Sequence, residues 1–522
     1  MTYITDTIVG RFAYTSVAIH TFGVVLLAGT VIQTLRSWYR LRHVPGPFLA
    51  SFSSAWMLRR SLSGRFHEHL REVGDTYGTL VRVGPNDLVA SDPETLRRMS
   101  AVRSPYTKGT FYETGRITPG EDTIVSLRDE ARHKALRSKM GPAFNGRENE
   151  GFSFGAGIDS QVCQLVNLID SKYLSQPGQH RPVQFFEKIS FFALDAISDI
   201  SFGQAFGYLT ADKDLYRSTT RLAQTWPLSL MLPRDGDQTG FGRLMGLVDS
   251  IIDKRLAPGA EPQKDMMQAF INSGMSRSEL TQQVFVQIIA GSISTTTAIC
   301  MTLLCLLTTP SAYAALIAEI DRATSTTTTT TTTTTANSRE SPLDAGSPAS
   351  IIITNTKARA LPYLQAVIRE GLRFYPPVIG LGSKQVPPGG DTIKGIYIPE
   401  GTQVGMNIFG LMRSRAIWGD DVDVFRPERW IEAEAAVQQG GDDAVARRLQ
   451  EMNGAVELVF GHGKYVCLGK GVAMMELGKV LFELLARYHF SIINKESPIK
   501  ASSAIFWAAK DLWLHIGPRR AR

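Results

Sequence analysis

The stretch that decides the fold is Phe460-Gly-His-Gly-Lys-Tyr-Val-Cys467-Leu-Gly469. Its cysteine follows a glycine-punctuated loop, and we expect the last long helix to begin at Cys467 and to end near Tyr488. Glycines let backbone N–H groups approach the sulfur, and a helix N-terminus favours the thiolate. A lone cysteine is more often a buried structural residue, so that alternative stands beside the interpretation as a thiolate metal ligand.

A single thiolate in apolar surroundings suits heme iron better than zinc, which needs three or four protein ligands. Upstream, the spacing of apolar residues predicts a helix from about Leu361 to Phe374, with Pro362 in its first turn. This helix contains Glu370-Gly-Leu-Arg373, whose two charged side chains share one face. Two strand-like runs follow at 392–398 and 403–408, before Pro427-Glu-Arg429-Trp430.

Together these motifs resemble the cytochrome P450 superfamily, whose signature is Phe-x-x-Gly-x-x-x-Cys-x-Gly. The fixed positions match at Phe460, Gly463, Cys467 and Gly469. The resemblance implies a mainly α heme-thiolate fold with a smaller β-rich region. It also implies heme b as cofactor, Cys467 as the iron ligand, and a buried charge triad formed by Glu370, Arg373 and Arg429.

Further heme contacts follow from the same resemblance. His133 and Arg137, spaced i and i+4, match the family's propionate-binding positions, although a surface histidine is nearly as good an interpretation of His133 alone. Lys384 and Lys464 stand where the family more often has arginine. Lysine keeps the positive charge but loses the bidentate fork of arginine.

A long segment without charged residues, 280–318, admits two interpretations. Val284–Leu307 is apolar enough to cross a membrane, but the polar run 292–297 at its centre suits lipid poorly. The segment is preceded by Ser276-Arg-Ser-Glu279, the spacing of a capping box, and closes near Pro310. We therefore predict a buried core helix.

The sequence departs from the family within this helix. The family pattern is small-Gly-x-acid-Thr, and this chain has Ala290-Gly-Ser-Ile-Ser-Thr295. By resemblance, Gly291 leaves room for dioxygen, Ile293 replaces the acid, and Ser294 replaces the threonine that helps to deliver protons. We expect Ser294 to carry the relay, with Thr295, Ser292 or water as alternatives. The departure keeps open a heme-thiolate enzyme that catalyses an O₂-independent rearrangement or dehydration.

The N-terminus carries no Asp, Glu, Lys or Arg from Phe12 to Leu35, which is long enough to span a bilayer as a helix. A cleaved signal peptide fits less well, because the leader lacks a basic region. Arginines after the apolar run place the body on the cytosolic side of the endoplasmic reticulum membrane. The expected segments are a lumenal N-terminus at 1–11, a transmembrane signal anchor at 12–35, a basic, proline-rich hinge at 36–47 and a heme-thiolate catalytic domain at 48–522.

Composition supports a globular body, with 43% hydrophobic and 20% charged residues. The net charge of +7 suits an acidic partner, an anionic membrane or a plain solvated surface, and no motif indicates nucleic-acid binding. Four scattered cysteines predict no disulfide framework. The threonine tract from Thr324 to Thr335 and the segment after it predict a disordered insert at about 324–350.

The resemblance implies a monooxygenase that oxidises a hydrophobic small molecule with O₂ and with electrons from NADPH, delivered by a membrane-bound flavoprotein reductase. Cys467-Leu-Gly-Lys-Gly471 is most similar to fungal microsomal members of secondary metabolism, which implies a terpenoid, polyketide or alkaloid-like substrate. A remote alternative is a non-catalytic membrane protein with two spans, Phe12–Leu35 and Val284–Leu307.

Overall fold

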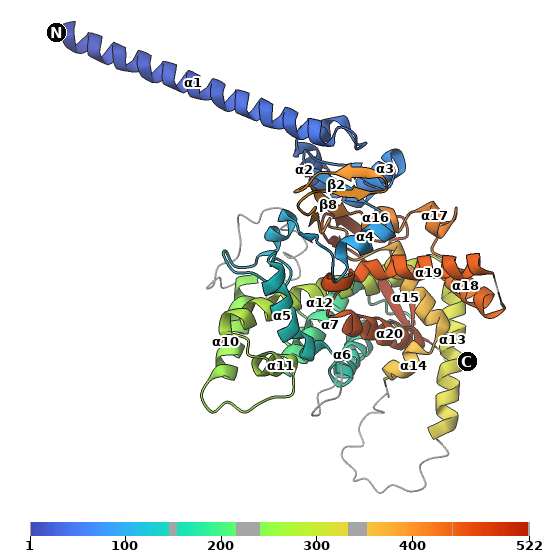
Figure 1. Cartoon of the computed structure of the whole chain (residues 1–522). Helices are drawn as coiled ribbons and strands as arrows, with labels where there is room; N and C mark the ends of the chain where they lie inside the picture. The colour runs from blue at the N-terminus through green and yellow to red at the C-terminus, as the bar shows by residue number, and fades with distance from the viewer. Residues whose placement is uncertain (1, 146–153, 216–240, 332–351, 441, 520–522) are drawn as a thin grey trace.

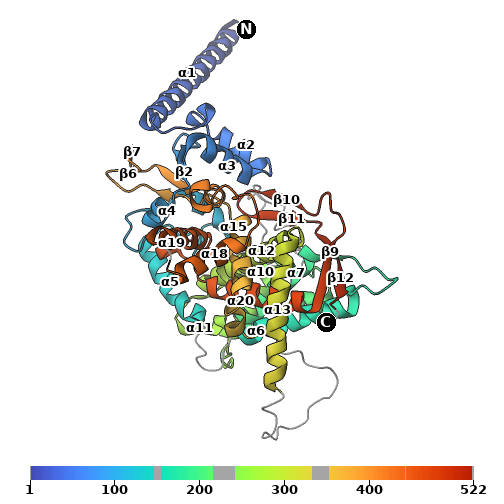
Figure 2. The same ribbon diagram turned by 90° about the vertical axis from the view of Figure 1, so that its right-hand side faces the viewer.

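The computed structural model describes residues 2–145, 154–215, 241–331, 352–440 and 442–519. A long N-terminal helix, α1 (Thr2–Leu41), projects from a mainly helical body (Figures 1 and 2). The helix α12 (Arg277–Leu307) runs through the middle of this body. It packs against α7 (Phe185–Phe202), α15 (Pro362–Phe374) and α20 (Lys470–Arg487).

Other helices surround this centre or lie between it and α1. They are α2 (Ala55–Leu62), α3 (Phe66–Tyr77), α4 (Pro93–Ser100), α5 (Glu130–Phe144), α6 (Phe154–Leu168), α8 (Tyr208–Ala211), α10 (Phe241–Leu256), α11 (Met266–Asn272), α13 (Pro310–Thr331), α14 (Asn355–Arg359), α16 (Ile408–Leu411), α17 (Arg415–Trp418), α18 (Glu428–Gln438) and α19 (Asp443–Glu457). Short 3₁₀ turns include η1 (Phe48–Ser51), η5 (Leu458–Phe460) and η6 (Gly463–Tyr465).

The strands β2, β6 and β7 lie near the end of α1 that joins the body, whereas β9 and β12 lie near the C-terminus (Figure 2). The five-stranded sheet has the order β1-β2-β8-β5-β3, formed by Leu80–Arg82, Asp87–Ala90, Gln403–Met406, Lys384–Gln385 and Thr107–Lys108. In this sheet β2 and β8 are parallel and the other pairs antiparallel. The smaller sheets are β4-β12-β9 (Val183–Gln184, Trp513–Pro518, Tyr488–Ile492), β6-β7 (Asp391–Ile393, Ile396–Ile398) and β10-β11 (Lys500–Ser503, Trp507–Lys510).

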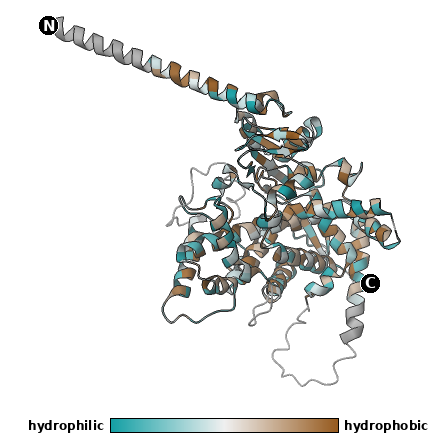
Figure 3. Ribbon diagram, in the orientation of Figure 1, coloured by the Kyte–Doolittle hydropathy of each residue, from teal (hydrophilic) through white to brown (hydrophobic). Residues whose placement is uncertain are grey.

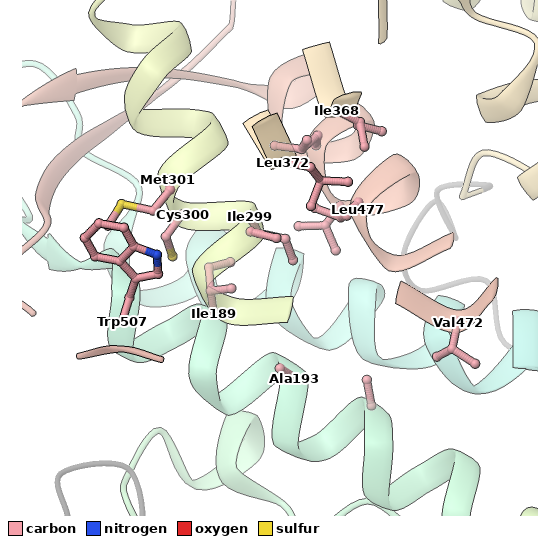
Figure 4. Packing of buried hydrophobic residues seen from close by; sticks show 14 of the residues in the cluster. Ile189, Ala193, Ile299, Cys300, Met301, Ile368, Leu372, Val472, Leu477 and Trp507 are labelled. Atoms are coloured by element: carbon pink, nitrogen blue, oxygen red, sulfur yellow. The ribbon is translucent and has the colours of Figure 1, made fainter. Parts of the chain in front are cut away.

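The predicted core helix is confirmed. The Ser276 hydroxyl accepts from the Glu279 amide, and the Glu279 carboxylate accepts from the Ser276 amide, which completes the capping box. By length and composition α12 could cross a membrane, but 72% of its most apolar window is buried in the protein. Figure 4 shows Ile299 of α12 near Ile189 of α7, Leu372 of α15 and Leu477 of α20. The two-span interpretation is therefore wrong.

The attachment of α1 differs from the expected hinge. The helix continues to Leu41, so residues 36–41 of that segment are helical. The buried guanidinium of Arg82 donates to five backbone carbonyls, those of Ser37, Trp38, Ser51, Gly84 and Pro85. Two of these acceptors lie on α1, which ties the end of the helix to the sheet.

The threonine tract also differs from the expectation at its start. The helix α13 continues to Thr331, so residues 324–331 are helical and the prediction of disorder is wrong there. A helix that already packs through Leu316 and Ile320 extends at little cost, because only its nucleation is unfavourable. Thr324 also donates its hydroxyl proton to the Ile320 carbonyl. Residues 332–350 of the predicted insert lie outside the described residues.

Candidate heme-thiolate site

The cysteine loop is closed by its own backbone. The amide of Cys467 donates to the carbonyl of Phe460 at 2.7 Å, so the loop between them turns back on itself. Gly463 has φ +56°, and a Cβ there would lie 2.2 Å from the carbonyl oxygen of Ser100. The positive φ and the close approach to α4 together exclude any larger residue at this signature position.

The helix after the loop begins at Lys470 and not at Cys467, with Gly469 as its N-cap. The helix begins later than expected because the 3₁₀ turn η6 precedes Cys467 and the amides of Gly469 and Lys470 donate to its sulfur. Burial raises the pKa of the Cys467 thiol, while the amides of Gly469 and Lys470 and the charge of Arg137 lower it. The residue itself is accessible to solvent. The site therefore offers a sulfur that a ligand can reach, together with donors that stabilise its thiolate form.

One face of α12 is open in the interior. Ala290 is exposed and Ser294 is half-buried, whereas Ile288 and Thr295 on other faces are buried. A Cβ on Gly291 would lie 2.9 Å from Cγ1 of Ile197 in α7. The missing side chain of Gly291 therefore lets α7 pack closely, and its role in leaving room for dioxygen stays a prediction. The open face instead carries Ala290 and Ser294.

The hydroxyls of α12 have different partners. Ser294 Oγ donates to the carbonyl of Ala290 at 2.6 Å, a contact within the helix. Thr295 Oγ1 lies 3.1 Å from Oε2 of Glu476 in α20, and both residues are buried. The contact between Thr295 and Glu476 was not predicted, since nothing in the sequence marks one glutamate of α20 as buried. The relay assigned to Ser294 stays a prediction.

Basic residues gather near the cysteine loop, and two of them, His133 and Arg137, lie on α5. His133 of α5 is 4% exposed, so its interpretation as a surface histidine is wrong. Burial, followed by the charge of Lys108, lowers the pKa of His133 to about 4, so the ring is neutral at pH 7. Burial also lowers the pKa of Arg137, and the negative form of Cys467 would raise it. Arg137 thus lies close enough to the sulfur of Cys467 for their charges to interact.

Lys384 and Lys464 belong to the same group of basic residues. Lys384 is 1% exposed, donates to Tyr112 Oη at 2.8 Å and lies 3.8 Å from the centre of the Tyr465 ring. Burial lowers its pKa well below the usual value. Lys464 donates to the carbonyls of Ser104 and Tyr106 and pairs with Glu130 at 2.9 Å.

Two further residues adjoin this group without any indication in the sequence, Lys108 and Tyr465. Lys108 is 3% exposed and pairs directly with Lys384 across β3 and β5. Burial lowers its pKa to about 7. The ring of Tyr465 lies 5.4 Å from that of His133, and its hydroxyl donates to Glu130. Strand pairing between segments far apart in the chain brings the two lysines together, and no local pattern signals it.

The charge triad forms as predicted. Arg373 donates to both carboxylate oxygens of Glu370, at 2.7 and 3.0 Å, and Arg429 Nε donates to the same carboxylate at 3.1 Å. All three are buried. Burial alone would raise the pKa of Glu370, but the two arginines hold it below the usual value. A Cβ on Gly371 would lie 2.0 Å from Thr302 Oγ1, so this helix lies directly on α12.

The residues present fit a heme. Cys467 offers one sulfur with backbone donors, and the open face of α12 is lined by small residues. The group Lys108, Arg137, Lys384 and Lys464 has more basic side chains than the carboxylates that act on it, Glu130 and Asp122, so the group favours a ligand with further negative charges. The two propionates of heme b have that chemistry.

Comparisons with known proteins agree with this geometry. The profile of the family described as Cytochrome P450 matches residues 44–511. Cytochrome P450 monooxygenase ABA1 of Pyricularia oryzae is 36% identical over 95% of this chain and 96% of its own length. Cytochrome P450 monooxygenases aba1 of Botryotinia fuckeliana and abl1 of Leptosphaeria maculans are each 34% identical, over 88% and 89% of this chain and 88% and 80% of their own lengths. The chain belongs to the cytochrome P450 family and is a heme-thiolate monooxygenase of the kind found in fungal secondary metabolism.

Proposed function

We propose that the enzyme oxidises a hydrophobic secondary metabolite of terpenoid, polyketide or alkaloid-like structure, using O₂ and electrons from NADPH. In the overall reaction, a substrate C–H group, O₂, NADPH and one proton are converted to a C–OH group, water and NADP⁺. The observation that carries the proposal is the closed loop that presents Cys467 beside the donors of Gly469 and Lys470. Bound heme would supply the oxidising power, tuned by the thiolate.

The chain's own residues bind and orient the cofactor. Cys467 would hold the iron of a bound heme, and Lys384, Lys108 and Arg137 would offer positive charge to its propionates. His133 is neutral and can donate one ring hydrogen bond. The ion network of Glu370 keeps α15 against α12, so that the open face with Ala290 and Ser294 stays in place.

We also propose that α1 is a membrane anchor. Apolar side chains along α1 are exposed, among them Phe22 at 67%, Leu27 at 66% and Ile32 at 65% (Figure 3). Arg36 and Arg42 follow them, which favours a cytosolic body. We propose an enzyme of the endoplasmic reticulum membrane that receives electrons from a membrane-bound flavoprotein reductase.

The ligand assignment is tested by the spectrum of the reduced protein with carbon monoxide. The parent should show the strongly red-shifted Soret band of thiolate ligation. Cys467→His should lose this band even where heme stays bound. Cys163→Ser, a change at a half-buried cysteine of α6, is the matched control and should keep it. Retention of the band in Cys467→His would exclude Cys467 as the ligand.

A second candidate function is an O₂-independent rearrangement or dehydration. The observation that favours it is the hydrogen bond from Ser294 to Ala290, which engages the only hydroxyl proton of that side chain within its own helix. Turnover of candidate pathway intermediates with and without NADPH, and with and without O₂, separates the two functions. Product formed in the absence of both would replace the monooxygenase assignment.

A further inference from the structure

Glu476 differs from the other buried carboxylates that the structure describes. Each of the others has a cation, backbone amides or both as partners: Asp195 with the amides of 207–209, Asp265 with Arg255, Glu319 with the amides of 363 and 364, Glu370 with Arg373, and Glu483 with Arg487. Glu476 is 2% exposed, and among the described residues its hydrogen-bond partner is the Thr295 hydroxyl.

This setting favours the neutral acid. An ionised carboxylate without a cation or backbone donors is strongly disfavoured in a buried site, and such a group takes up a proton instead. Burial raises the pKa of Glu476 to about 8, with the Thr295 hydrogen bond as a smaller opposing effect. Glu476 therefore carries a proton at pH 7 inside the helical core.

The hydroxyl that meets Glu476 belongs to a polar run in α12. Ser294, Thr295, Thr296 and Thr297 follow one another, and the first lies on the open face. The side-chain oxygens of Thr296 and Thr297 are buried and have no hydrogen-bond partner among the described residues. Buried polar atoms of this kind commonly bind internal water, which can carry protons. A proton relay from Thr295 to the face that carries Ser294 would require internal water of this kind.

We propose that Glu476, acting through Thr295, supplies protons for oxygen reduction in place of the acid that Ile293 replaces. In the structure the Thr295 hydroxyl donates to Oε2 of Glu476. In the proposed step this hydrogen bond reverses: the protonated carboxyl group of Glu476 passes its proton to Thr295 Oγ1, while Thr295 passes its own hydroxyl proton to the next oxygen of the relay. Thr295 is unchanged, and the Glu476 carboxylate takes up a proton that comes from solvent. Reduction of O₂ to peroxide consumes two protons and the two electrons of NADPH, so the step is measurable without a known substrate. The inference rests on the proposed O₂-dependent function.

The first test is infrared difference spectroscopy of the holoenzyme. A protonated carboxyl group has a C=O stretch distinct from that of a carboxylate. The parent should show this band at pH 7, and Glu476→Gln should lack it. Glu483→Gln is the matched control, since Glu483 lies on the same helix and is equally buried but is paired with Arg487. Its band pattern should equal that of the parent. A parent band that survives in Glu476→Gln would overturn the inference.

The second test measures NADPH-driven O₂ consumption by the reconstituted holoenzyme in H₂O and D₂O. Glu476→Gln and Thr295→Val should slow consumption about tenfold or more and change the solvent isotope effect. Thr295→Ser, which keeps the hydroxyl, should restore both. Unchanged consumption in Glu476→Gln would show a purely structural role. A parent that consumes no O₂ with NADPH would overturn the proposed function together with this inference, and the two failures are thus distinguishable.

Discussion

Lys108 and Lys384 lie directly opposite each other on β3 and β5, and both ammonium groups are buried. Like charges that face each other across a strand pair are destabilising, and burial lowers the pKa of both amino groups, that of Lys108 to about 7. Without an anionic partner, folding therefore favours loss of protons from the two lysines, which costs stability at pH 7. Backbone carbonyls of Ile124 and Val125 accept from Lys108, and Tyr112 accepts from Lys384, but neither lysine has a carboxylate within ion-pair distance among the described residues. The pair therefore opposes folding of the cofactor-free chain and favours binding of an anionic group.

We expect Lys108→Met to have opposite effects on the two forms of the protein. The apo-protein should be as stable as the parent or more stable, because the substitution removes a buried amino group whose protonated form is disfavoured in the folded chain. The holo-protein should lose heme faster to a heme acceptor, by roughly 10- to 100-fold, the equivalent of about 1.5–3 kcal/mol for a charged hydrogen bond. Lys134→Met, at an exposed position of α5, should change neither quantity. Slower or unchanged heme loss in Lys108→Met would remove Lys108 from the heme contacts.

The Glu370 network predicts loss of folded protein and not merely slower turnover. Glu370→Ala leaves Arg373 and Arg429 buried without their shared carboxylate, which costs roughly 3–5 kcal/mol. We expect little soluble holo-protein from this variant, measured as heme absorbance per unit of expressed chain. Arg369→Ala is the control on the same helix, since its ion pair with Glu434 is partly exposed. A normal yield of holo-protein from Glu370→Ala would contradict the structural role.

Local sequence patterns predicted the parts of this structure that depend on neighbouring residues. The capping box before α12, the bounds of α15 and the Glu370–Arg373 pair follow from spacing within one helix. The pattern over 392–398 predicts one strand, but positive φ angles at Lys394 and Gly395 turn this run into the β6-β7 hairpin. Lys108 and Glu476 could not be predicted, because their burial comes from strand pairing and helix packing between distant segments.

The Arg82 contacts predict where the N-terminus can be cut. Removal of residues 2–34 keeps the carbonyls of Ser37 and Trp38, so the thermal midpoint should stay near that of the parent. Removal of residues 2–41 leaves a buried guanidinium without two of its five acceptors. That loss should cost about 1–3 kcal/mol.

Arg82→Met provides the control for this truncation pair. It should destabilise the form that begins at residue 35 more than the form that begins at residue 42, because only the longer form has the α1 acceptors. Equal losses in both forms, measured by thermal unfolding, would show that α1 does not depend on Arg82.

The protonated state of Glu476 also predicts how stability depends on pH. The unfolded chain ionises this carboxyl above its ordinary pKa, about 4.3, whereas the folded chain keeps the proton up to a pKa of about 8. Between these values the folded state binds more protons than the unfolded state, so the free energy of unfolding falls as pH rises. Glu476→Gln cannot ionise and should lack this contribution. Relative to the parent, the variant should therefore gain stability from pH 5 to pH 8, on the order of a few kcal/mol.

The comparison between variant and parent isolates Glu476 from other groups that titrate in the same window, such as Lys108, because both proteins contain them. Denaturant unfolding of the two proteins at several pH values measures the difference. Glu483→Gln should show no comparable gain, since Arg487 and the Ile353 amide stabilise the ionised form of Glu483 in the folded chain. A difference between Glu476→Gln and parent that stays constant from pH 5 to pH 8 would mean that Glu476 is ionised in the folded protein. In that case the carboxyl group could not hold the proton that oxygen reduction requires.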